Sequence, residues 1–215
     1  MKLKNIDIEL QSQLNRGEVL PVMEEFYTIQ GEGFHAGKAS WFIRIGGCDV
    51  GCHWCDVKES WNPNLFPPLS TVEVARRAIE SGADTVVITG GEPLNYNLDM
   101  LCGLLKKSGM ATHIESSGSA NISGQWDWIC LSPKKAKPPV EEIYPISHEL
   151  KIIISDESDF VWAEKNKLRM SKDCQLFLQP EWSRREDVIG LITDYILKNP
   201  EWKVSLQIHK YMHIP

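Results

Sequence analysis

The chain has 215 residues, enough for one full-sized domain, and its 42% hydrophobic and 24% charged residues are ordinary for a globular protein. Its formal net charge of -6 argues against a protein that coats nucleic acid, because phosphate contacts require a basic surface. No stretch approaches the roughly 20 apolar residues of a membrane span, and residues 1–10 lack the apolar core of a signal peptide. We therefore expect a cytoplasmic protein with no nucleic-acid or membrane partner, whose cysteines stay reduced.

The predicted elements alternate between strands and helices. Two strands come first, at 21–29 and 40–45, where apolar residues partly alternate with polar ones. A helix at 70–82 begins with a capping box of Ser70 and Glu73 and ends at a glycine. Further strands are predicted at 84–89, 111–115, 126–131, 149–155, 174–178 and 203–209. Further helices are predicted at 97–109 and 184–198.

This alternation predicts an α/β fold with a mostly parallel sheet and right-handed crossovers, either open or curled toward a barrel. Functional sites in such sheets gather at the carboxyl ends of the strands. Glycine-rich or polar motifs follow four of the predicted strands: QGEG (30–33), GGC (46–48), GGEP (90–93) and ESSG (115–118). We expect these segments to meet in one site.

Three cysteines, Cys48, Cys52 and Cys55, lie close together in a loop that contains glycine. A structural zinc site would need a fourth ligand, and His53 lies awkwardly between two of the cysteines. A disulfide is disfavoured in a reducing compartment. The spacing favours an iron–sulfur cluster with one iron left open, over zinc or no metal. The other three cysteines are expected to be buried as small apolar side chains: Cys102, Cys130 and Cys174.

The cysteine spacing, with Trp54 before the last cysteine, resembles that of the radical S-adenosylmethionine (SAM) superfamily, and TGGEP at 89–93 resembles its second motif. Further segments, in order along nearly the whole chain, resemble the family of 7-carboxy-7-deazaguanine synthases: FYTIQGEG (26–33), FIRIGGC (42–48), WCD (54–56), ESSG (115–118), SPK (132–134), LQP (178–180) and LQIHKYMHIP (206–215). The resemblance implies one radical SAM domain over residues 1–215, folded as a trimmed, incomplete (β/α) barrel.

The resemblance also implies an activity. Members of the family are lyases that convert 6-carboxy-5,6,7,8-tetrahydropterin into 7-carboxy-7-deazaguanine with loss of ammonia, on the way to queuosine and other 7-deazapurines. A 4Fe–4S cluster on the three cysteines cleaves SAM, and the resulting radical attacks the substrate, so no side chain is expected to carry the chemistry itself. The implied partners are a flavodoxin or ferredoxin-type electron donor and a second copy of the chain in a homodimer.

The family motifs carry over to this chain residue by residue. They imply SAM contacts at Gly91, Glu92, Ser117, Ser132, Pro133, Lys134 and Gln179. They imply substrate contacts at Ile29, Gln30, Gly31, Arg44, Thr89, His209 and Pro215, the last through the terminal carboxylate. An arginine can bind a substrate carboxylate through two hydrogen bonds, and an amide suits the edge of a pterin. The alternatives are a solvated strand face for Arg44, a turn for Gln30 and a solvated loop for Lys134.

One position departs from the family pattern. Many members carry a Thr or Ser that ligates Mg²⁺ where this chain has Val57, whose side chain has no oxygen. We hypothesise that the Lys58 ammonium replaces the charge of the ion; the alternative is that Lys58 points to solvent and Mg²⁺ is held by other groups. The segment 58–70 is predicted to be an irregular loop, in which Trp61 and Phe66 either contact the electron donor or pack.

Two other functions remain open from the sequence alone. An activase of a glycyl-radical enzyme would share the cysteine spacing, but it would explain neither the QGEG segment nor the HKY near the terminus. A non-catalytic module that binds zinc or a cluster would hold metal without cleaving SAM.

Overall fold

The computed structural model describes residues 7–215, so the first six residues of the predicted domain, and most of the segment examined for a signal peptide, lie outside the described part. The strands are β1 (Val19–Leu20), β2 (Val22–Ile29), β3 (Ala39–Ile45), β4 (Leu69–Ser70), β5 (Thr85–Gly90), β6 (Ala111–Ser116), β7 (Trp128–Leu131), β8 (Glu149–Ile154), β9 (Gln175–Pro180) and β10 (Trp202–Val204). The α-helices are α1 (Ile8–Asn15), α2 (Thr71–Glu80), α3 (Asp99–Lys107), α4 (Ser158–Lys167), α5 (Arg185–Lys198) and α6 (Ile208–Met212). Short 3-10 helices are η1 (Lys58–Trp61), η2 (Pro63–Leu65), η3 (Pro93–Asn95), η4 (Glu141–Ile146) and η5 (Trp182–Arg184).

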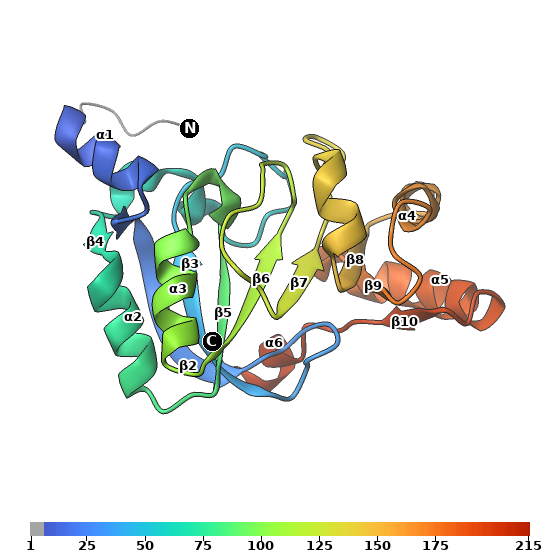
Figure 1. The fold of residues 1–215 in the computed structure, drawn as a ribbon. Coiled ribbons are helices and arrows are strands. Elements are labelled where there is room, and N and C mark those ends of the chain that lie inside the picture. Colours follow the sequence, from blue (N-terminus) through green and yellow to red (C-terminus); the bar gives the residue numbers. More distant parts are fainter. Residues whose placement is uncertain (1–6) are drawn as a thin grey trace.

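Eight strands form one sheet in the order β10-β9-β8-β7-β6-β5-β3-β2 (Figure 1). Every neighbouring pair from β3 to β10 is parallel, and β2 runs antiparallel to β3. Within residues 7–215 no pairing joins β10 to β2, so the sheet stays open. This confirms the predicted mostly parallel, incomplete barrel.

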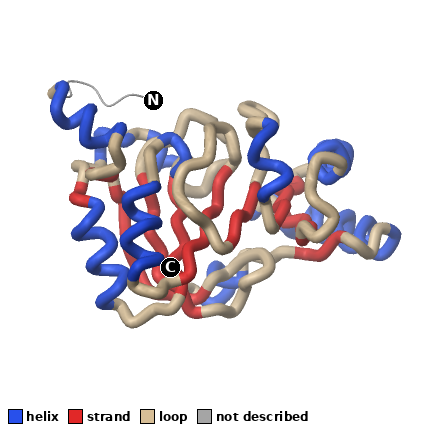
Figure 2. The backbone as a smooth tube through the Cα atoms, viewed as in Figure 1, coloured by secondary structure: helices blue, strands red, loops and turns tan. Residues whose placement is uncertain are grey.

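The helices cover the two ends of the sheet but not its middle, so the barrel lacks some of the helices of a complete (β/α) barrel. Helices α2 and α3 lie over one end of the sheet, and α4 and α5 over the other (Figure 2). Leu101 and Leu105 of α3 share one buried face because they are one turn apart. No α-helix separates β6 from β7 or β7 from β8 in the described chain, since a loop and η4 make these connections. None of the described helices is both long and apolar enough to cross a membrane.

Two sequence predictions fail at the ends of elements. Ser70 is the N-cap of α2, but its side chain makes no capping hydrogen bond, because Ser70 is also the last residue of β4 and pairs there with Val19. The acid of the predicted capping box, Glu73, instead pairs with Arg76 and Arg77. The segment 58–70 is more regular than expected, since it contains η1, η2 and β4.

The last predicted strand, 203–209, is also wrong beyond its first residues. Strand β10 ends at Val204, and helix α6 begins at Ile208. Ser205 donates its hydroxyl proton to Gln179 and accepts a bond from the Gly33 amide, at 2.7 and 2.9 Å. These inward bonds turn the chain away from β9, so the C-terminal segment runs back under the sheet to α6 (Figure 1).

Candidate active site

A cavity of about 380 Å³ lies within the open barrel, against the carboxyl ends of the parallel strands. It receives residues from β3, β5, β6, β8 and β9, from the cysteine loop, from the loop after β2, and from the C-terminal segment. Most of the predicted site residues line it: Cys48, Cys52, Cys55, Gly91, Ser117, Ser132, Lys134, Gln179, Ile29, Gln30, Gly31, Arg44, Thr89, His209 and Pro215. Glu92, Pro133 and Lys58 do not line it. The four segments QGEG, GGC, GGEP and ESSG therefore all contribute residues to one cavity, as predicted.

The cysteine triplet faces this cavity from the loop that follows β3. The loop is held by backbone bonds from the Gly47 amide to Ser60 and from the Cys48 amide to Trp61, at 2.6 and 3.2 Å. All six cysteines of the chain are free thiols, and the three in the triplet are partly exposed while the other three are buried, as predicted. Burial raises the pKa of the Cys48 thiol, which leaves it dependent on a bound cation to become a thiolate.

The triplet supplies the three thiols that a 4Fe–4S cluster with one open iron requires. No group of three His, Cys, Asp or Glu side chains in the described chain converges on one metal-ion position. A zinc site would need a fourth protein ligand at a single point.

The GGEP segment packs against this loop because two of its residues have no side chain. Gly90 has φ 144°, and a Cβ there would lie 2.1 Å from the Ile45 carbonyl oxygen. A Cβ on Gly91 would lie 2.5 Å from the Gly47 carbonyl oxygen and 2.9 Å from Cys48 Cβ. Only glycine lets the backbone of β5 approach the cysteine loop this closely.

Glu92 does not line the cavity, although the family motif implied a contact with SAM. Its residue is only 1% exposed, and its carboxylate lies behind the cavity wall. It accepts hydrogen bonds from the Leu94 amide, from the Ser117 amide and from the hydroxyls of Ser116 and Ser117, at 2.5 to 3.1 Å. Glu92 therefore ties the end of β5 to the end of β6 and fixes the position of Ser117.

The predicted SAM residues on later strands form one side of the cavity. Lys134 Nζ donates to the carbonyl and the hydroxyl oxygens of Ser132, both at 2.6 Å, and lies 5.5 Å from the Trp54 ring centre. Burial lowers the pKa of Lys134. Gln179 is buried at the end of β9 and accepts the Ser205 hydroxyl. Lys134 is thus held against the cysteine loop and is not a solvated loop charge.

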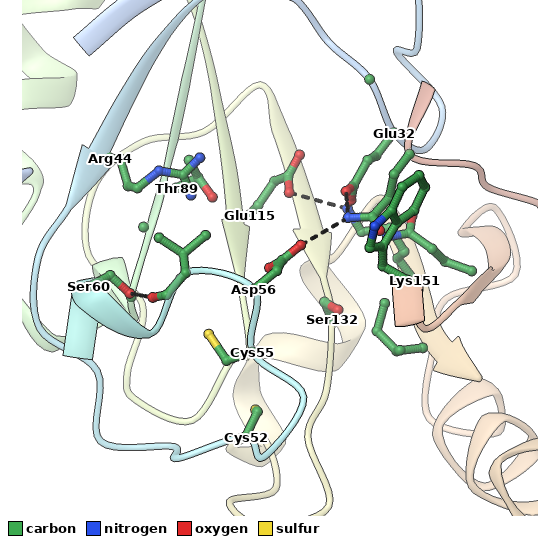
Figure 3. A pocket seen from close by; sticks show the side chains of 18 of the residues that line it. Glu32, Arg44, Cys52, Cys55, Asp56, Ser60, Thr89, Glu115, Ser132 and Lys151 are labelled. Carbon is green, nitrogen blue, oxygen red and sulfur yellow. Dashed lines mark hydrogen bonds and ion pairs between the residues drawn. The ribbon is translucent and has the colours of Figure 1, made fainter. Parts of the chain in front are cut away.

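The predicted substrate residues line the remaining wall. Arg44 and Thr89 are register partners on β3 and β5, and their side chains lie together in Figure 3. Arg44 Nε pairs with Glu24 Oε1 at 2.6 Å. Gly31 packs on His209: a Cβ there would lie 2.1 Å from Nδ1 of the imidazole, and the Gly31 carbonyl accepts from the Ile208 amide at 3.0 Å.

Three charged residues of the cavity were not among the predicted site residues, although Glu32 lies in the QGEG segment and Glu115 in the ESSG segment. Glu32, Glu115 and Lys151 meet in the cavity, and Lys151 Nζ lies 2.5 Å from Glu32 Oε2 and 3.2 Å from Glu115 Oε2 (Figure 3). The signals that could have found this group are the acidic residues of these two segments and a lysine inside the apolar run of β8. Burial opposes the charge on Glu32, but the Lys151 ammonium and a bond from Gln207 prevail and lower the pKa of Glu32 to about 2.

The position after the triplet does not fit a magnesium ion. The Val57 side chain has no oxygen, and its carbonyl already accepts the hydroxyl and the amide of Ser60, at 2.6 and 3.1 Å. The carboxylate of Asp56 pairs with Lys210 Nζ at 2.5 Å. Lys58 is exposed and lies outside the cavity lining. The cation that the structure places beside Asp56 is therefore Lys210, and nothing in the structure brings Lys58 to the site.

The two aromatic residues of the 58–70 segment have separate surroundings. Phe66 packs on Gly46, where an added Cβ would lie 2.2 Å from its ring. Trp61 lines the cavity. Phe66 is thus packed inside this chain, and Trp61 faces the cavity; the contact with an electron donor stays a prediction.

Comparison with known proteins gives consistent matches. A model of the radical SAM superfamily matches residues 42–130. A 7-carboxy-7-deazaguanine synthase of Flavobacterium psychrophilum is 55% identical over 207 residues, which cover 96% of this chain and 98% of the relative. One from Synechocystis sp. is 46% identical, over 90% of this chain and 93% of the relative. The crystal structure of QueE from Escherichia coli has a TM-score of 0.78 at 27% identity, over 93% of this chain and 98% of that chain.

Proposed function

The chain belongs to the family of 7-carboxy-7-deazaguanine synthases, and from that membership we propose that it converts 6-carboxy-5,6,7,8-tetrahydropterin into 7-carboxy-7-deazaguanine with loss of ammonia. It is a radical SAM enzyme, which implies a 4Fe–4S cluster and SAM as cofactors. The observation that carries the proposal is the cavity, because three free thiols and a set of buried polar groups suited to a flat heterocycle line the same space.

Cys48, Cys52 and Cys55 would hold the cluster and leave one iron free for SAM. The cluster and SAM, when bound, supply the radical that starts the rearrangement of the pterin. Ser117, Ser132, Lys134 and Gln179 would bind SAM, with Gly91 allowing close approach and Pro133 buried beneath. Glu92 would act on SAM through Ser117, whose hydroxyl and amide it fixes.

The substrate would lie between the cysteine loop and the C-terminal segment. Arg44 would bind its carboxylate and Thr89 would pack beside it, while Gln30, His209 and the carboxylate of Pro215 would meet the ring. Ile29 and Gly31 would contact the ring through apolar and backbone surface. The C-terminal segment would also exclude water from the reacting atoms.

Magnesium has no evident protein ligand at Val57, so we propose that turnover does not depend on it. The positive charge next to Asp56 comes from Lys210 instead. This replaces Lys58, the residue first suggested by the sequence, because Lys58 is outside the cavity.

The remaining features of the proposal come from the family resemblance. We propose that residues 1–215 form one radical SAM domain, that the chain is a homodimer, and that a flavodoxin or ferredoxin-type protein delivers the electron. A reducing cytoplasm would keep the triplet free to hold the cluster.

The alternative functions fit less well. An activase of a glycyl-radical enzyme must admit a protein segment, whereas here the C-terminal residues His209, Lys210 and Pro215 occupy one wall of the cavity. A non-catalytic metal module would have no use for the buried polar groups deeper in the cavity. Anaerobic reconstitution of the cluster, followed by mass analysis of the products from SAM, reductant and the carboxylated pterin, tests the proposal directly.

A further inference from the structure

A closed set of hydrogen bonds joins four segments of the chain inside the cavity. Gln30 Nε2 donates to Glu115 Oε1 at 2.8 Å, and the Glu32 amide donates to Gln30 Oε1 at 3.1 Å. Lys151 Nζ bridges the other oxygen of Glu115 to Glu32 Oε2. Gln207 Nε2 donates to Glu32 Oε1 at 2.8 Å. Lys151 is thus the centre of a network that holds the loop after β2, β6, β8 and the C-terminal segment together.

The charges of this network do not cancel. Glu32 and Glu115 carry two negative charges against the single positive charge of Lys151, whose side chain is only 4% exposed. A buried charge without a partner is unfavourable, so an excess carboxylate is not expected in a purely structural salt bridge. Here the excess faces a cavity. Each carboxylate oxygen accepts from a protein donor, Glu32 also interacts with the Gln179 side chain, and lone pairs remain for a further donor.

The network and Arg44 lie on different sides of the cavity. Figure 3 shows Arg44 and Thr89 at one side, Glu32 and Lys151 at the other, and Glu115 between them. A ligand with a carboxylate at one end and N–H donors at the other would bind in only one orientation. Arg44 would attract its carboxylate, and the net negative charge of the network would repel that carboxylate from the opposite side. A reduced, carboxylated pterin has this distribution of groups.

We propose that Lys151 is a positioning residue for the substrate, which holds the Glu32 and Glu115 carboxylates in place so that both accept hydrogen bonds from N–H groups of the pterin ring. This inference rests on the proposed function. It assigns to Lys151 no contact with the reacting atoms. Its effect passes through the two glutamates, which without their counter-ion would share a proton or move apart.

The titratable groups around the network set the expected pH behaviour. Those that face Lys151 are Glu115 from β6, Cys130 from β7, Glu149 from β8, Glu32 from the loop and the ammonium of Lys134. Asp56 and His209 also interact electrostatically with Glu32. With Lys151 present the pKa of Glu32 is lowered to about 2, so Glu32 stays ionised at neutral pH. Without it, burial and mutual repulsion raise the pKa of one carboxyl, and that carboxyl accepts hydrogen bonds well only after it loses its proton at higher pH.

The first test compares Lys151→Met with Lys203→Met, an exposed lysine of β10, in reconstituted enzyme. The dissociation constant of 6-carboxy-5,6,7,8-tetrahydropterin is measured without an electron source, from about pH 6 to about pH 8.5. We expect K151M to keep its iron content and its SAM cleavage without pterin, to bind the pterin about 100-fold more weakly at neutral pH, and to bind better as the pH rises. K203M should match the wild type, whose affinity should change little with pH.

Binding by K151M within about twofold of the wild type, or an equal pH dependence of both, would overturn the inference. If K151M does not fold, the double variant E32Q/K151M returns the network to one net negative charge, as in the wild type, and it must still bind the pterin more weakly than the wild type. Proton uptake by the wild type on binding, measured by calorimetry in buffers of different ionisation enthalpy, needs no variant. No net uptake or release is expected, and release of a proton near neutral pH would contradict charged glutamates. A wild type that binds no pterin at all would instead contradict the proposed function.

Discussion

Lys210 donates to Asp56 across 2.5 Å and so connects helix α6 to the residue that follows the last cysteine of the triplet. Gln207, one turn earlier, donates to Glu32 at 2.8 Å and to Asp56 at 3.4 Å. Pro215, at the end of this segment, lines the cavity. The last residues of the chain are therefore part of the cavity wall, and their loss should affect the ligand more than the fold.

Deletion of Pro215 should weaken binding of the pterin about tenfold, because it moves the terminal carboxylate that would accept ring N–H groups. The matched control is Pro215→Ala, which keeps the carboxylate in place and should bind normally. Equilibrium binding without reductant measures the effect, and iron analysis should show an intact cluster in both. Unchanged affinity in the deletion would remove the terminal carboxylate from the site.

Magnesium should have little effect on turnover. In enzyme stripped with a chelator and reconstituted, added Mg²⁺ should change kcat/KM by less than about twofold, because Val57 offers no ligand and Asp56 is already paired. Lys58→Ala should behave like the wild type, whereas Lys210→Met should lower kcat/KM about tenfold by leaving Asp56 unpaired. Strong stimulation by Mg²⁺ in the wild type would show that the ion is held by other groups.

Glu92→Ala should destabilise the protein by about 2 to 4 kcal/mol, because it leaves the amides of Leu94 and Ser117 without a partner in a buried place. Urea unfolding measures the loss. Glu157→Ala, an exposed glutamate without a capping bond, should change stability by less than about 0.5 kcal/mol. A stable Glu92→Ala variant that has lost only SAM affinity would favour the direct SAM contact first expected.

Stability should fall as the pH drops below about 6.5, because of His113. Burial on β6, together with the nearby charge of His35, lowers the pKa of His113 from 6.5 to about 4. The unfolded chain therefore binds a proton at pH values where the folded chain does not, which costs about 2 kcal/mol at about pH 5. His113→Gln should flatten the decline in thermal unfolding temperature between these pH values, and His53→Gln, in the exposed loop, should not. Equal slopes in all three proteins would contradict this cause.

The sequence predicted the part of the site that consists of short motifs. Cys48 to Cys55, GGEP and ESSG each follow a strand, and parallel strands bring their carboxyl ends to one edge, so pattern and topology together placed them. The network of Glu32, Glu115 and Lys151 was not predicted, because its members are far apart in the chain and only the folded barrel brings them together. Glu32 and Glu115 lie in the QGEG and ESSG segments, and Lys151 lies within an apolar strand, but nothing in the sequence alone showed that the three side chains meet.

The wrong predictions at the ends of helices and strands also arise because contacts between distant segments decide the local structure. Ser70 meets the pattern of a capping box, yet its pairing with Val19 decides its geometry. The residues after Val204 have strand propensity, yet the bonds of Ser205 and Gln207 into the cavity turn the chain into α6. Local propensity is a weak preference that tertiary contacts override, and here the contacts that override it belong to the site.

The most direct test of the account is anaerobic reconstitution with iron and sulfide, followed by SAM, a reductant and 6-carboxy-5,6,7,8-tetrahydropterin, with mass analysis of the products. We expect a brown protein with a 4Fe–4S cluster that yields 7-carboxy-7-deazaguanine and ammonia, and variants with alanine at Cys48, Cys52 or Cys55 that yield neither cluster nor product. Cys174→Ala, which removes a buried thiol outside the cavity, should retain both. A colourless protein that holds zinc, or a cluster that cleaves SAM and leaves the pterin unchanged, would contradict the account.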